Sequence, residues 1–336
     1  MSMTTQKERN GEIIVSVLCT VYRHEPYLRQ CLDGIVSQQT DFRFEAIVHD
    51  DASPDGCRAI IEEYARRYPD LIRPICQTEN QYSKTHDLYR SILFPAARGR
   101  YIALCEGDDY WTDPRKLQKQ VALMESRPEC GFCYTSYRIY DQAGGTFRHG
   151  DFRAREGRVY DDLLASRFRI CTASLLFRRD LVATLPPLDA RTYHCGDIYW
   201  WYHFSYRSQA CCLPDATCVY RILPQSASHF TRCRDRIAFL ATSARTRKWF
   251  VANCPPRRRA VARRVLKKSQ VALCKQALAT ADYALMQESR PAFFPLMSLK
   301  KVGYTLLARW TSGHPERFAR LAACYARHLD AKDRRR

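Results

Sequence analysis

The 336-residue chain has no stretch close to the roughly 18 consecutive apolar residues that a membrane-spanning helix requires. Its first eleven residues contain Lys7, Glu8 and Arg9 and no apolar run, so we expect no secretory signal in them. A chain of this length can bury a sizeable core, in one large domain or in two. These features predict a cytoplasmic protein.

Glycine-rich nucleotide-binding loops are also missing. The end of the first predicted strand, 18–22, reads Leu-Cys-Thr-Val-Tyr and contains no glycine. The Gly-x-Gly-x-x-Gly turn of dinucleotide oxidoreductases is therefore absent, and no Gly-rich, Lys-bearing phosphate loop of ATPases occurs elsewhere. Both of those enzyme classes are disfavoured.

The cysteines lack the spacing of a zinc site. Cys130 and Cys133 form a Cys-x-x-Cys pair, but no second cysteine pair or histidine pair completes it. The 16 cysteines are scattered along a chain long enough to form a core. We interpret them as reduced, mostly buried, small apolar side chains.

Acidic residues are scarce only in the last third of the chain. Residues 1–231 hold 29 Lys and Arg against 29 Asp and Glu, whereas residues 232–336 hold the remaining 25 basic and 6 acidic residues. The whole net charge of +19 therefore belongs to the C-terminal region. Such a charge suits an anionic partner, either nucleic acid or a membrane surface.

Apolar, β-rich runs alternate with helical segments in the first part of the chain. This alternation predicts an α/β protein with a mostly parallel sheet, βαβ crossovers and helices on its faces. The predicted strands are 12–20, 44–48, 71–77, 101–105, 130–140, 170–179 and 217–222. Five helices are predicted in the same part of the chain. They cover residues 26–37, a segment that ends near 68, residues 88–97 with an entry at 80–82, residues 115–126, and a segment that begins at Asp197. Residues 141–157 are predicted to form a loop or hairpin over the cleft.

Three carboxylates crowd into four positions at the end of the strand 101–105. Glu106, Asp108 and Asp109 surround Gly107, which allows a sharp turn where open α/β sheets bind ligands. Like charges this close raise one another's pKa unless a cation neutralises them. Oxygen ligands suit Mg²⁺ or Mn²⁺, which in turn bridge to phosphate oxygens. The structural alternative is a solvated acidic turn that caps the next helix.

These motifs resemble a known family. The segment 15–134 is similar to the nucleotide-sugar-binding half of family 2 glycosyltransferases, which have the GT-A fold. Glu106-Gly107-Asp108 stands where that family carries its Asp-x-Asp metal motif, with Glu in place of the first Asp. The longer block, Glu-Gly-Asp-Asp-Tyr-Trp-x-Asp-Pro-x-Lys-Leu-x-x-Gln over 106–120, is similar to the branch that builds bacterial surface polysaccharides.

The resemblance implies a role for several further residues. Thr20 and Tyr22 stand where the family's Pro-x-Tyr packs against the nucleotide base, and Asp50 and Asp51 begin its Asp-Asp-x-Ser-x-Asp, whose acids meet uracil and ribose. A carboxylate is suited to accept from the uracil N–H or from sugar hydroxyls. In that block Ser53 and Asp55 are also expected to cap the following helix.

The second half of the chain carries the other implied residues. Asp197 enters an aromatic helix and resembles the family's catalytic base, with helix capping as its alternative role. Arg221 and His229 fall in the family's Tyr-Arg, Pro-x-Ser-x-Ser ending, and the resemblance implies that one or the other closes over the diphosphate. We therefore divide the chain into a catalytic domain, 1–231, with a nucleotide-sugar half 12–140 and an acceptor half 141–231, and a basic helical region, 232–336.

The implied function is an inverting, metal-dependent glycosyltransferase that moves a sugar from a nucleotide sugar, expected to be a UDP-sugar, to a carbohydrate or lipid-linked hydroxyl. Such an enzyme would act in bacterial surface polysaccharide or glycolipid assembly. One alternative is a sugar-phosphate nucleotidyltransferase, but that class carries a Gly-rich turn at its first strand. A nucleic-acid-binding protein is another, but it leaves the acidic loops unexplained, so we expect no nucleic acid partner.

The basic region 232–336 has helical periodicity. At helical spacing the apolar residues fall on one face and the basic residues on the opposite face. This amphipathic pattern suits peripheral binding to the anionic inner face of a membrane. A solvated face packed on the catalytic domain is the equally open alternative. The apolar face consists of Ala262, Val265, Leu266, Ala272 and Leu273, and the basic face of Arg263, Arg264, Lys267, Lys268 and Lys275.

Overall fold

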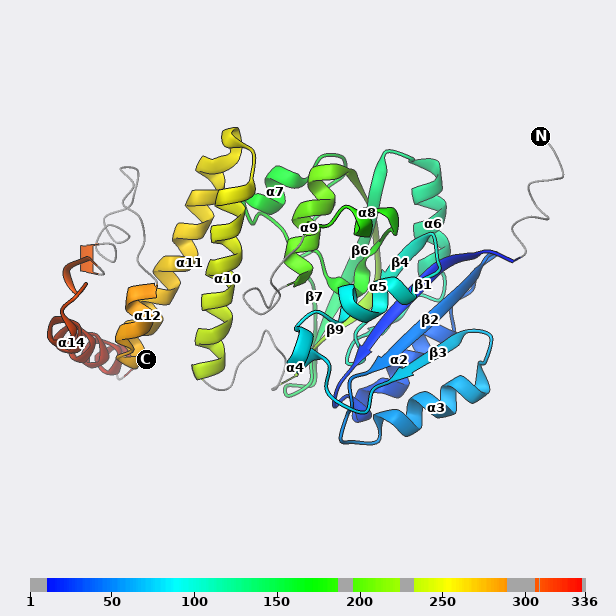
Figure 1. Ribbon diagram of the computed structural model, residues 1–336, viewed down its shortest axis with the longest axis horizontal. Coiled ribbons are helices and arrows are strands. Elements are labelled where there is room, and N and C mark those ends of the chain that lie inside the picture. The colour runs from blue at the N-terminus through cyan, green and yellow to red at the C-terminus, as the bar shows by residue number, and fades with distance from the viewer. Residues whose placement is uncertain (1–10, 187–195, 224–232, 289–305, 308, 334–336) are drawn as a thin grey trace. The chain divides into compact units, whose positions relative to one another are not determined.

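A computed structural model describes residues 11–186, 196–223, 233–288, 306–307 and 309–333 of the chain. The chain divides into two compact units, Met1–Pro224 and Gln225–Arg336. The first unit is an α/β domain and the second is helical (Figure 1). No helix in the described part of either unit has both the length and the apolar composition needed to cross a bilayer.

The first unit is built on a nine-stranded sheet whose N-terminal part is parallel. Its first four strands pair in the order β3-β2-β1-β4, all parallel, which confirms the predicted βαβ pattern. The central strands are mostly apolar because both of their faces are covered. The strands are β1 (Ile13–Val21), β2 (Arg43–Asp50), β3 (Ile72–Cys76) and β4 (Tyr101–Leu104).

The remaining strands make the sheet mixed. Strand β8 lies between β4 and β6 and is antiparallel to both, β9 runs parallel to β6, and β5 is antiparallel to β9. The predicted hairpin after β6 is confirmed, because β7 folds back on β6. Their bounds are β5 (Tyr110–Trp111), β6 (Cys130–Asp141), β7 (Thr146–His149), β8 (Leu176–Arg178) and β9 (Gln209–Ile222).

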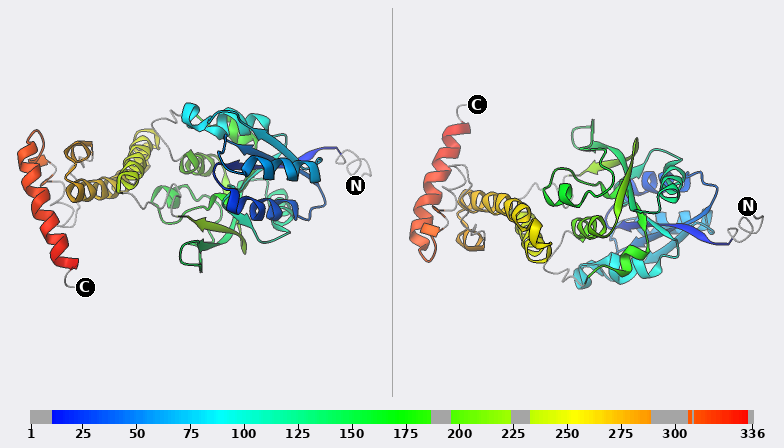
Figure 2. Two further views of the ribbon diagram at one scale, coloured as in Figure 1. Left: turned by 90° about the horizontal axis from the view of Figure 1, so that it is seen from below. Right: turned by 90° about the horizontal axis from the view of Figure 1, so that it is seen from above.

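Helices cover both faces of the sheet. One apolar core joins alternate residues of the strands to α2, α3 and α6. The opposite face is aromatic, with Phe94 of α5 against Phe177 of β8 and Trp200 of α9. Both views in Figure 2 show blue α2 and the cyan segment of α4 and α5 on opposite sides of the strands. The bounds are α2 (Glu25–Val36), α3 (Cys57–Arg67), α4 (Tyr82–Thr85), α5 (Phe94–Ala96), α6 (Lys116–Ser126) and α9 (Gly196–Arg207).

Two predicted elements were wrong in extent. The expected helix, entered through 80–82 and continuing over 88–97, is interrupted before Leu88: α4 ends at Thr85, and His86 follows with a φ of 55°. Residues 88–96 are helical as predicted, but Tyr89–Leu93 forms a π-helical turn that runs directly into the three residues of α5. Of the strand predicted at 170–179, only Leu176–Arg178 pairs, because Thr172–Ser174 forms a 3-10 turn. The short helices α7 (Tyr160–Leu164) and α8 (Asp180–Ala183) were not predicted.

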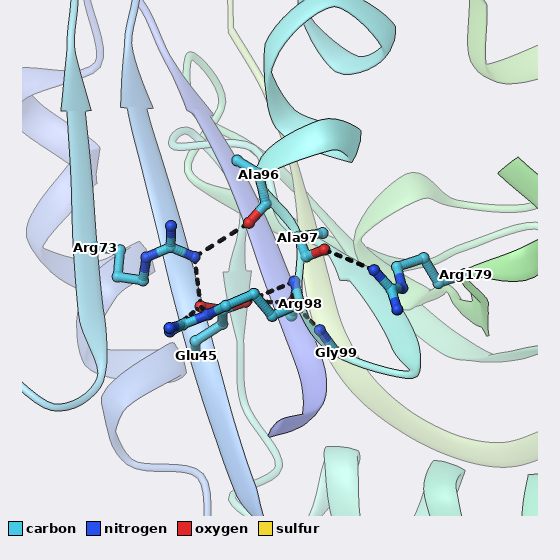
Figure 3. A network of polar contacts seen from close by, with 8 residues as sticks. Glu45, Arg73, Ala96, Ala97, Arg98, Gly99 and Arg179 are labelled. Atoms are coloured by element: carbon cyan, nitrogen blue, oxygen red, sulfur yellow. Dashed lines mark hydrogen bonds and ion pairs between the residues drawn. The ribbon is translucent and has the colours of Figure 1, made fainter. Parts of the chain in front are cut away.

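A buried glutamate joins neighbouring segments near the amino ends of the parallel strands. Glu45 of β2 is fully buried and accepts hydrogen bonds from Ser16 Oγ (2.6 Å), Arg73 Nη1 (2.6 Å) and the main chain and guanidinium of Arg98 (2.6–2.9 Å). Figure 3 shows these groups converging on the turn that leads into β4. Burial alone would raise the pKa of Glu45, but the hydrogen bonds outweigh it and lower the pKa to about 2.

Glu45→Gln should destabilise the protein by about 3 kcal/mol at pH 7, because the ionised carboxylate is the form that the folded state favours. A depressed folded pKa gives stability that is present above the unfolded value near 4.5 and is lost as the pH falls toward 2. The difference between wild type and variant should therefore shrink between these pH values, as measured by urea unfolding. Glu63→Gln is the control, since Glu63 pairs with Arg29 on the surface and should matter little.

The helical unit has its own small core. Leu273, Cys274 and Ala277 of α11 are buried with Phe318 of α14. Lys267 was expected on the exposed basic face, and this was wrong: it is 6% exposed. Helix α11 contacts α10, α12 and α14, so its buried face is wider than the apolar stripe alone. The bounds are α10 (Cys233–Asn253), α11 (Arg259–Thr280), α12 (Tyr283–Glu288) and α14 (Pro315–Asp333).

Candidate active site

The acidic loop 106–109 joins β4 to β5 at the carboxyl end of the parallel strands. Its backbone is fixed against β1, because the N–H of Gly107 donates to the carbonyl of Thr20 at 2.9 Å. A tight turn follows, in which the N–H of Asp109 donates to the carbonyl of Glu106 at 2.9 Å. The predicted position of the loop, at the carboxyl end of a parallel strand, is thereby confirmed.

The first two acids of the loop, Glu106 and Asp108, affect each other's charge, and Asp108 is partly exposed to solvent. The Asp108 side chain is 17% exposed, and its Oδ1 lies 3.9 Å from Nε2 of His24. Burial, followed by the nearby carboxylates of Asp108 and Asp197, raises the pKa of Glu106 to about 8. Glu106 and Asp108 therefore form an electronegative pair that a cation would stabilise.

Asp109 has a different position from the other two acids. It is 2% exposed, and its Oδ1 accepts the backbone N–H of Arg221 at 2.8 Å. Burial and the neighbouring carboxylates of Asp108 and Glu106 raise its pKa well above the ordinary range. The sequence makes Asp109 a possible site residue, and the structure shows that its carboxylate joins the loop to β9.

Arg221 was expected to close over the diphosphate of a donor, but its guanidinium is buried and has partners within the protein. It is 5% exposed and sits beneath the acidic loop, where its Nε donates to the carbonyl of Asp108 at 2.8 Å. Its two terminal nitrogens donate to Gln142 Oε1 (2.7 Å) and Gln30 Oε1 (2.6 Å). Three tyrosine rings surround its guanidinium at 4.9–5.6 Å, those of Tyr27, Tyr110 and Tyr140. Arg221 thus supports the loop from below.

The second half of the block 106–120 is also structural. Lys116 is fully buried, donates to Gln120 Oε1 at 2.6 Å and lies 4.5 Å from the ring centroid of Trp111. Gln120 donates to the carbonyl of Ser174 at 2.9 Å, and Trp111 Nε1 to that of Ala173 at 3.0 Å. These contacts tie β5 and α6 to the 3-10 turn. The residues of this motif therefore hold in place the strand and helix that follow the acidic loop.

The acids after β2 are buried and hold the neighbouring loops. Asp50 Oδ1 accepts the N–H of Ser53 at 3.1 Å. Asp51 accepts the N–H groups of Gln81 (2.6 Å) and Tyr82 (3.0 Å), so it caps the start of α4. A carboxylate has further acceptor sites beyond these bonds. Both acids therefore have structural roles that leave acceptor capacity beside the end of β1.

The capping expected for α3 is half correct. Asp55 Oδ1 accepts the N–H of Cys57, the first residue of α3, at 3.3 Å. Ser53 does not cap the helix, because its Oγ accepts the N–H of Arg23 at 3.1 Å. Ser53 instead joins the loop after β2 to the loop after β1.

Tyr22 and Thr20 occupy the end of β1. The Tyr22 ring is 41% exposed, with the guanidinium of Arg23 at 5.3 Å from its centroid. Thr20 Oγ1 lies 3.5 Å from the hydroxyl of Tyr89. An exposed aromatic ring next to buried carboxylates is a surface on which a nucleotide base can stack.

Asp197 lies in the first turn of α9, as predicted. Its Oδ1 accepts the N–H of Ile198 at 2.7 Å, which gives it part of the capping role. Burial raises its pKa, although that hydrogen bond opposes the change. Contacts through Tyr89 bring α9 close to the acidic loop: its ring packs on Trp200 of α9 at 5.0 Å, and its hydroxyl lies 3.5 Å from Thr20, whose carbonyl accepts the N–H of Gly107. His229, the other candidate in this half, lies outside the described residues.

Sequence analysis missed two residues at this site. His24, next to Asp108, is half-buried, and burial lowers its pKa despite the acids around it. Its Nδ1 has no hydrogen-bond partner among the residues that the structure describes. Tyr89 comes close through the π-helical turn, which no sequence pattern indicated.

The donor groups present fit a divalent cation shared with a ligand. No cluster of three or more His, Cys, Asp or Glu suited to a metal occurs in the described parts of the chain. Glu106 and Asp108 nevertheless supply two carboxylates, and burial together with the charge of Asp108 raises the pKa of Glu106 to about 8. Mg²⁺ commonly takes one or two carboxylates and completes its shell with water and substrate phosphates. The pair therefore suits a metal that binds together with a phosphorylated ligand.

Comparison with known sequences identifies relatives over the same part of the chain. The model of the family "Glycosyl transferase family 2" matches residues 16–185. An uncharacterized protein of Mycobacterium tuberculosis is 39% identical over 215 residues, 62% of this chain and 58% of that protein. The putative teichuronic acid biosynthesis glycosyltransferase TuaG of Bacillus subtilis is 30% identical over 50% of this chain and 64% of its own. The match thus spans less than two thirds of the length of these relatives.

A further relative has a more specific name. It is the UDP-Glc:α-D-GlcNAc-diphosphoundecaprenol β-1,3-glucosyltransferase WfgD of Escherichia coli. It is 26% identical over 190 residues, which cover 56% of this chain and 69% of WfgD.

Solved structures confirm the GT-A-type fold. A mannosyltransferase from Pyrobaculum calidifontis, in complex with GDP-Man and Mn²⁺, has a TM-score of 0.57 at 19% identity over 95% of this chain and 88% of its own. TarS of S. aureus in complex with UDP-GlcNAc has a TM-score of 0.58 at 13% identity over 94% of this chain and 92% of its own. The family model covers half of the chain, and the fold agrees with it. The chain therefore belongs to glycosyl transferase family 2.

Proposed function

We propose that this protein transfers a sugar from a nucleotide sugar to a hydroxyl group, with inversion at the anomeric carbon. The observation that carries this proposal is the proximity of the loop with Glu106 and Asp108, at the end of β4, to the start of α9 with Asp197, which the contacts of Tyr89 with Trp200 and Thr20 establish. The pair Glu106 and Asp108 can hold a divalent cation that binds the phosphates of a donor, and Asp197 can act as a general base. The site thus has the groups needed on both sides of a reacting anomeric carbon.

The donor side is suited to a UDP-sugar. The exposed ring of Tyr22 can stack on the base, and the buried acids Asp50 and Asp51 can accept from the uracil N–H and the ribose hydroxyls. Both WfgD and TarS are named with UDP-sugars, which supports the same choice. Thr20, at the end of β1, lies between this base site and the acidic loop.

Mn²⁺ or Mg²⁺ would be held by Asp108 and Glu106 and, when bound, would neutralise the negative charge that grows on the departing nucleotide. Asp197 would take the proton of the acceptor hydroxyl as that oxygen attacks the anomeric carbon from the side opposite to the leaving group. Its raised pKa suits this role, because a base works best when its pKa approaches the working pH. Arg221 and Asp109 would keep the loop in place during the reaction.

The acceptor that fits best is a saccharide carried on a lipid. TuaG is named for teichuronic acid biosynthesis, and the name of WfgD specifies an acceptor linked to diphosphoundecaprenol. Assembly of a bacterial surface polysaccharide at the inner face of the membrane would account for both the site and the basic second unit.

The test is a panel of nucleotide sugars, assayed for nucleotide release with Mn²⁺ present. We expect release from a UDP-sugar that rises when a saccharide acceptor is added, and a β-linked product from an α-linked donor. Diphosphate release from a sugar 1-phosphate and UTP would instead show a nucleotidyltransferase. A salt-dependent shift of DNA, without any nucleotide release, would show a nucleic-acid-binding protein.

We also propose that the helical unit binds an anionic membrane surface as a peripheral element. Exposed basic side chains cluster along α11, among them Arg263, Arg264 and Lys268. Each Lys or Arg near an anionic leaflet contributes roughly 1 kcal/mol, so a few suffice for retention near a lipid-linked acceptor. The attraction weakens with salt, since the Debye length is only about 10 Å at 0.1 M.

The full-length protein should co-sediment with vesicles that contain phosphatidylglycerol at low salt and be released at high salt. Changing Arg263, Arg264 and Lys268 to Gln should remove most of this binding, because the charges are lost while the helix-forming character remains. Removal of three exposed arginines from the first unit, Arg43, Arg66 and Arg67, is the matched control and should have little effect. Equal binding to neutral vesicles would contradict the proposal.

A further inference from the structure

The π-helical turn Tyr89–Leu93 brings one tyrosine to the active site. Such turns are rare and occur frequently at functional sites, since the extra residue redirects side chains. Here the turn lies between α5 and α4, the helix whose start is capped by Asp51. Tyr89 is its first residue, and none of the roles described above uses it.

The ring of Tyr89 is held in place by aromatic contacts. It packs edge-to-face on Trp200 of α9, with the ring centroids 5.0 Å apart and an interplanar angle of 77°. Phe94 of α5 contacts it at 5.8 Å. Trp200 is three residues beyond Asp197 on the same helix, so the ring is fixed relative to the proposed base. These contacts determine where the hydroxyl points without using the hydroxyl itself.

The hydroxyl lies among groups from both sides of the site. Its distance to Thr20 Oγ1, 3.5 Å, is at the outer limit of a hydrogen bond. The carbonyl of Thr20 accepts the N–H of Gly107, so the acidic loop is adjacent. Burial, and then the carboxylate of Glu106, raise the pKa of Tyr89 well above its usual value, with Asp197 contributing as well. The hydroxyl therefore stays protonated and has only a weak partner within the described residues.

We propose that Tyr89 is a sugar-binding residue whose hydroxyl donates a hydrogen bond to an oxygen of the transferred sugar, between the acidic loop and Asp197. The inference rests on the proposed function. In the reaction, a sugar attached to a diphosphate at Glu106 and Asp108 has its anomeric carbon within reach of Asp197, so its ring must lie near both groups. Sugar hydroxyls can donate to carboxylates, but a sugar oxygen that accepts needs a donor, and Tyr89 supplies one beside the acids.

Tyr89→Phe tests this role, because the ring contacts with Trp200 and Phe94 remain and only the hydroxyl is lost. For the donor identified in the nucleotide-sugar panel, we expect KM to rise about tenfold, which corresponds to one lost hydrogen bond. The affinity for free UDP, measured by calorimetry, should stay unchanged. The preference for the best donor over the second-best one should change as well, since a lost sugar contact alters discrimination.

The control variant is Tyr68→Phe, a tyrosine that follows α3, which should leave KM, UDP affinity and donor preference as in wild type. A Tyr89→Phe variant with wild-type KM and donor preference would overturn the inference while leaving the proposed function intact. Equal weakening of UDP and UDP-sugar binding would overturn it too, because the residue would then act on the nucleotide or on the fold. A wild-type protein that cleaves no nucleotide sugar would overturn the proposed function itself.

Discussion

Asp197→Asn should lower kcat by roughly 10²- to 10⁴-fold, the range that a general base contributes, while leaving the affinity for the donor unchanged. Asn retains a side-chain oxygen that can accept the N–H of Ile198, so stability should stay within about 1 kcal/mol of wild type. Single-turnover kinetics would measure the loss, and calorimetry with UDP would measure the donor affinity. A normal transfer rate in the Asn variant would reduce Asp197 to a helix cap.

The pH dependence gives a second readout for the same residue. A base must be deprotonated to act, and burial raises the pKa of Asp197 above the ordinary aspartate value near 3.8. The rate of the wild type should therefore fall as the pH drops through this raised pKa, and it should be restored as the pH rises. The residual activity of the Asn variant should lack this acidic limb.

Asp108→Ala should cost transfer activity on the order of 10²-fold or more, because the departing nucleotide loses a carboxylate that would hold its counter-cation. The fold should survive, since removal of one acid from a crowded loop relieves repulsion with Glu106. Divalent-dependent binding of UDP should weaken in parallel, as measured by calorimetry with and without Mn²⁺.

The matched control is Asp70→Ala, which removes an exposed carboxylate from the loop before β3. It should change neither transfer nor the effect of Mn²⁺ on UDP binding. Should the Asp108→Ala variant bind UDP with the same Mn²⁺ dependence as wild type, Asp108 would not be a metal ligand and the assignment would fail.

Sequence reasoning worked best where the physical signal is local. The strands β1, β2, β4 and β6 were found because a strand covered on both faces needs a continuous apolar run, as in 101–105. Asp197 was found at its helix start because an acid before an apolar segment is a capping pattern. The acidic loop was placed correctly because its three acids and glycine directly follow such an apolar run, at the carboxyl end of a strand.

It failed where a side chain's position depends on partners far away in the sequence. Arg221 carries a family motif, but Gln30 and Gln142, 191 and 79 residues away, draw its guanidinium under the loop. Lys267 reads as surface charge on its own helix, and only the packing of the neighbouring helices buries it. Tyr89 reaches the site through a change of helix type that no residue periodicity marks.

The strand order has a consequence for protein engineering. Strand β8, from the later part of the catalytic unit, lies between β4 and β6, and β9 pairs with β5. A chimera that joined residues 12–140 of this chain to the acceptor half of a relative would therefore create new interfaces along β4, β5 and β6, which pair with β8 and β9, and around Arg221. Exchange of donor specificity between family members is better attempted by grafting single side chains around Tyr22 and Tyr89 than by recombining halves.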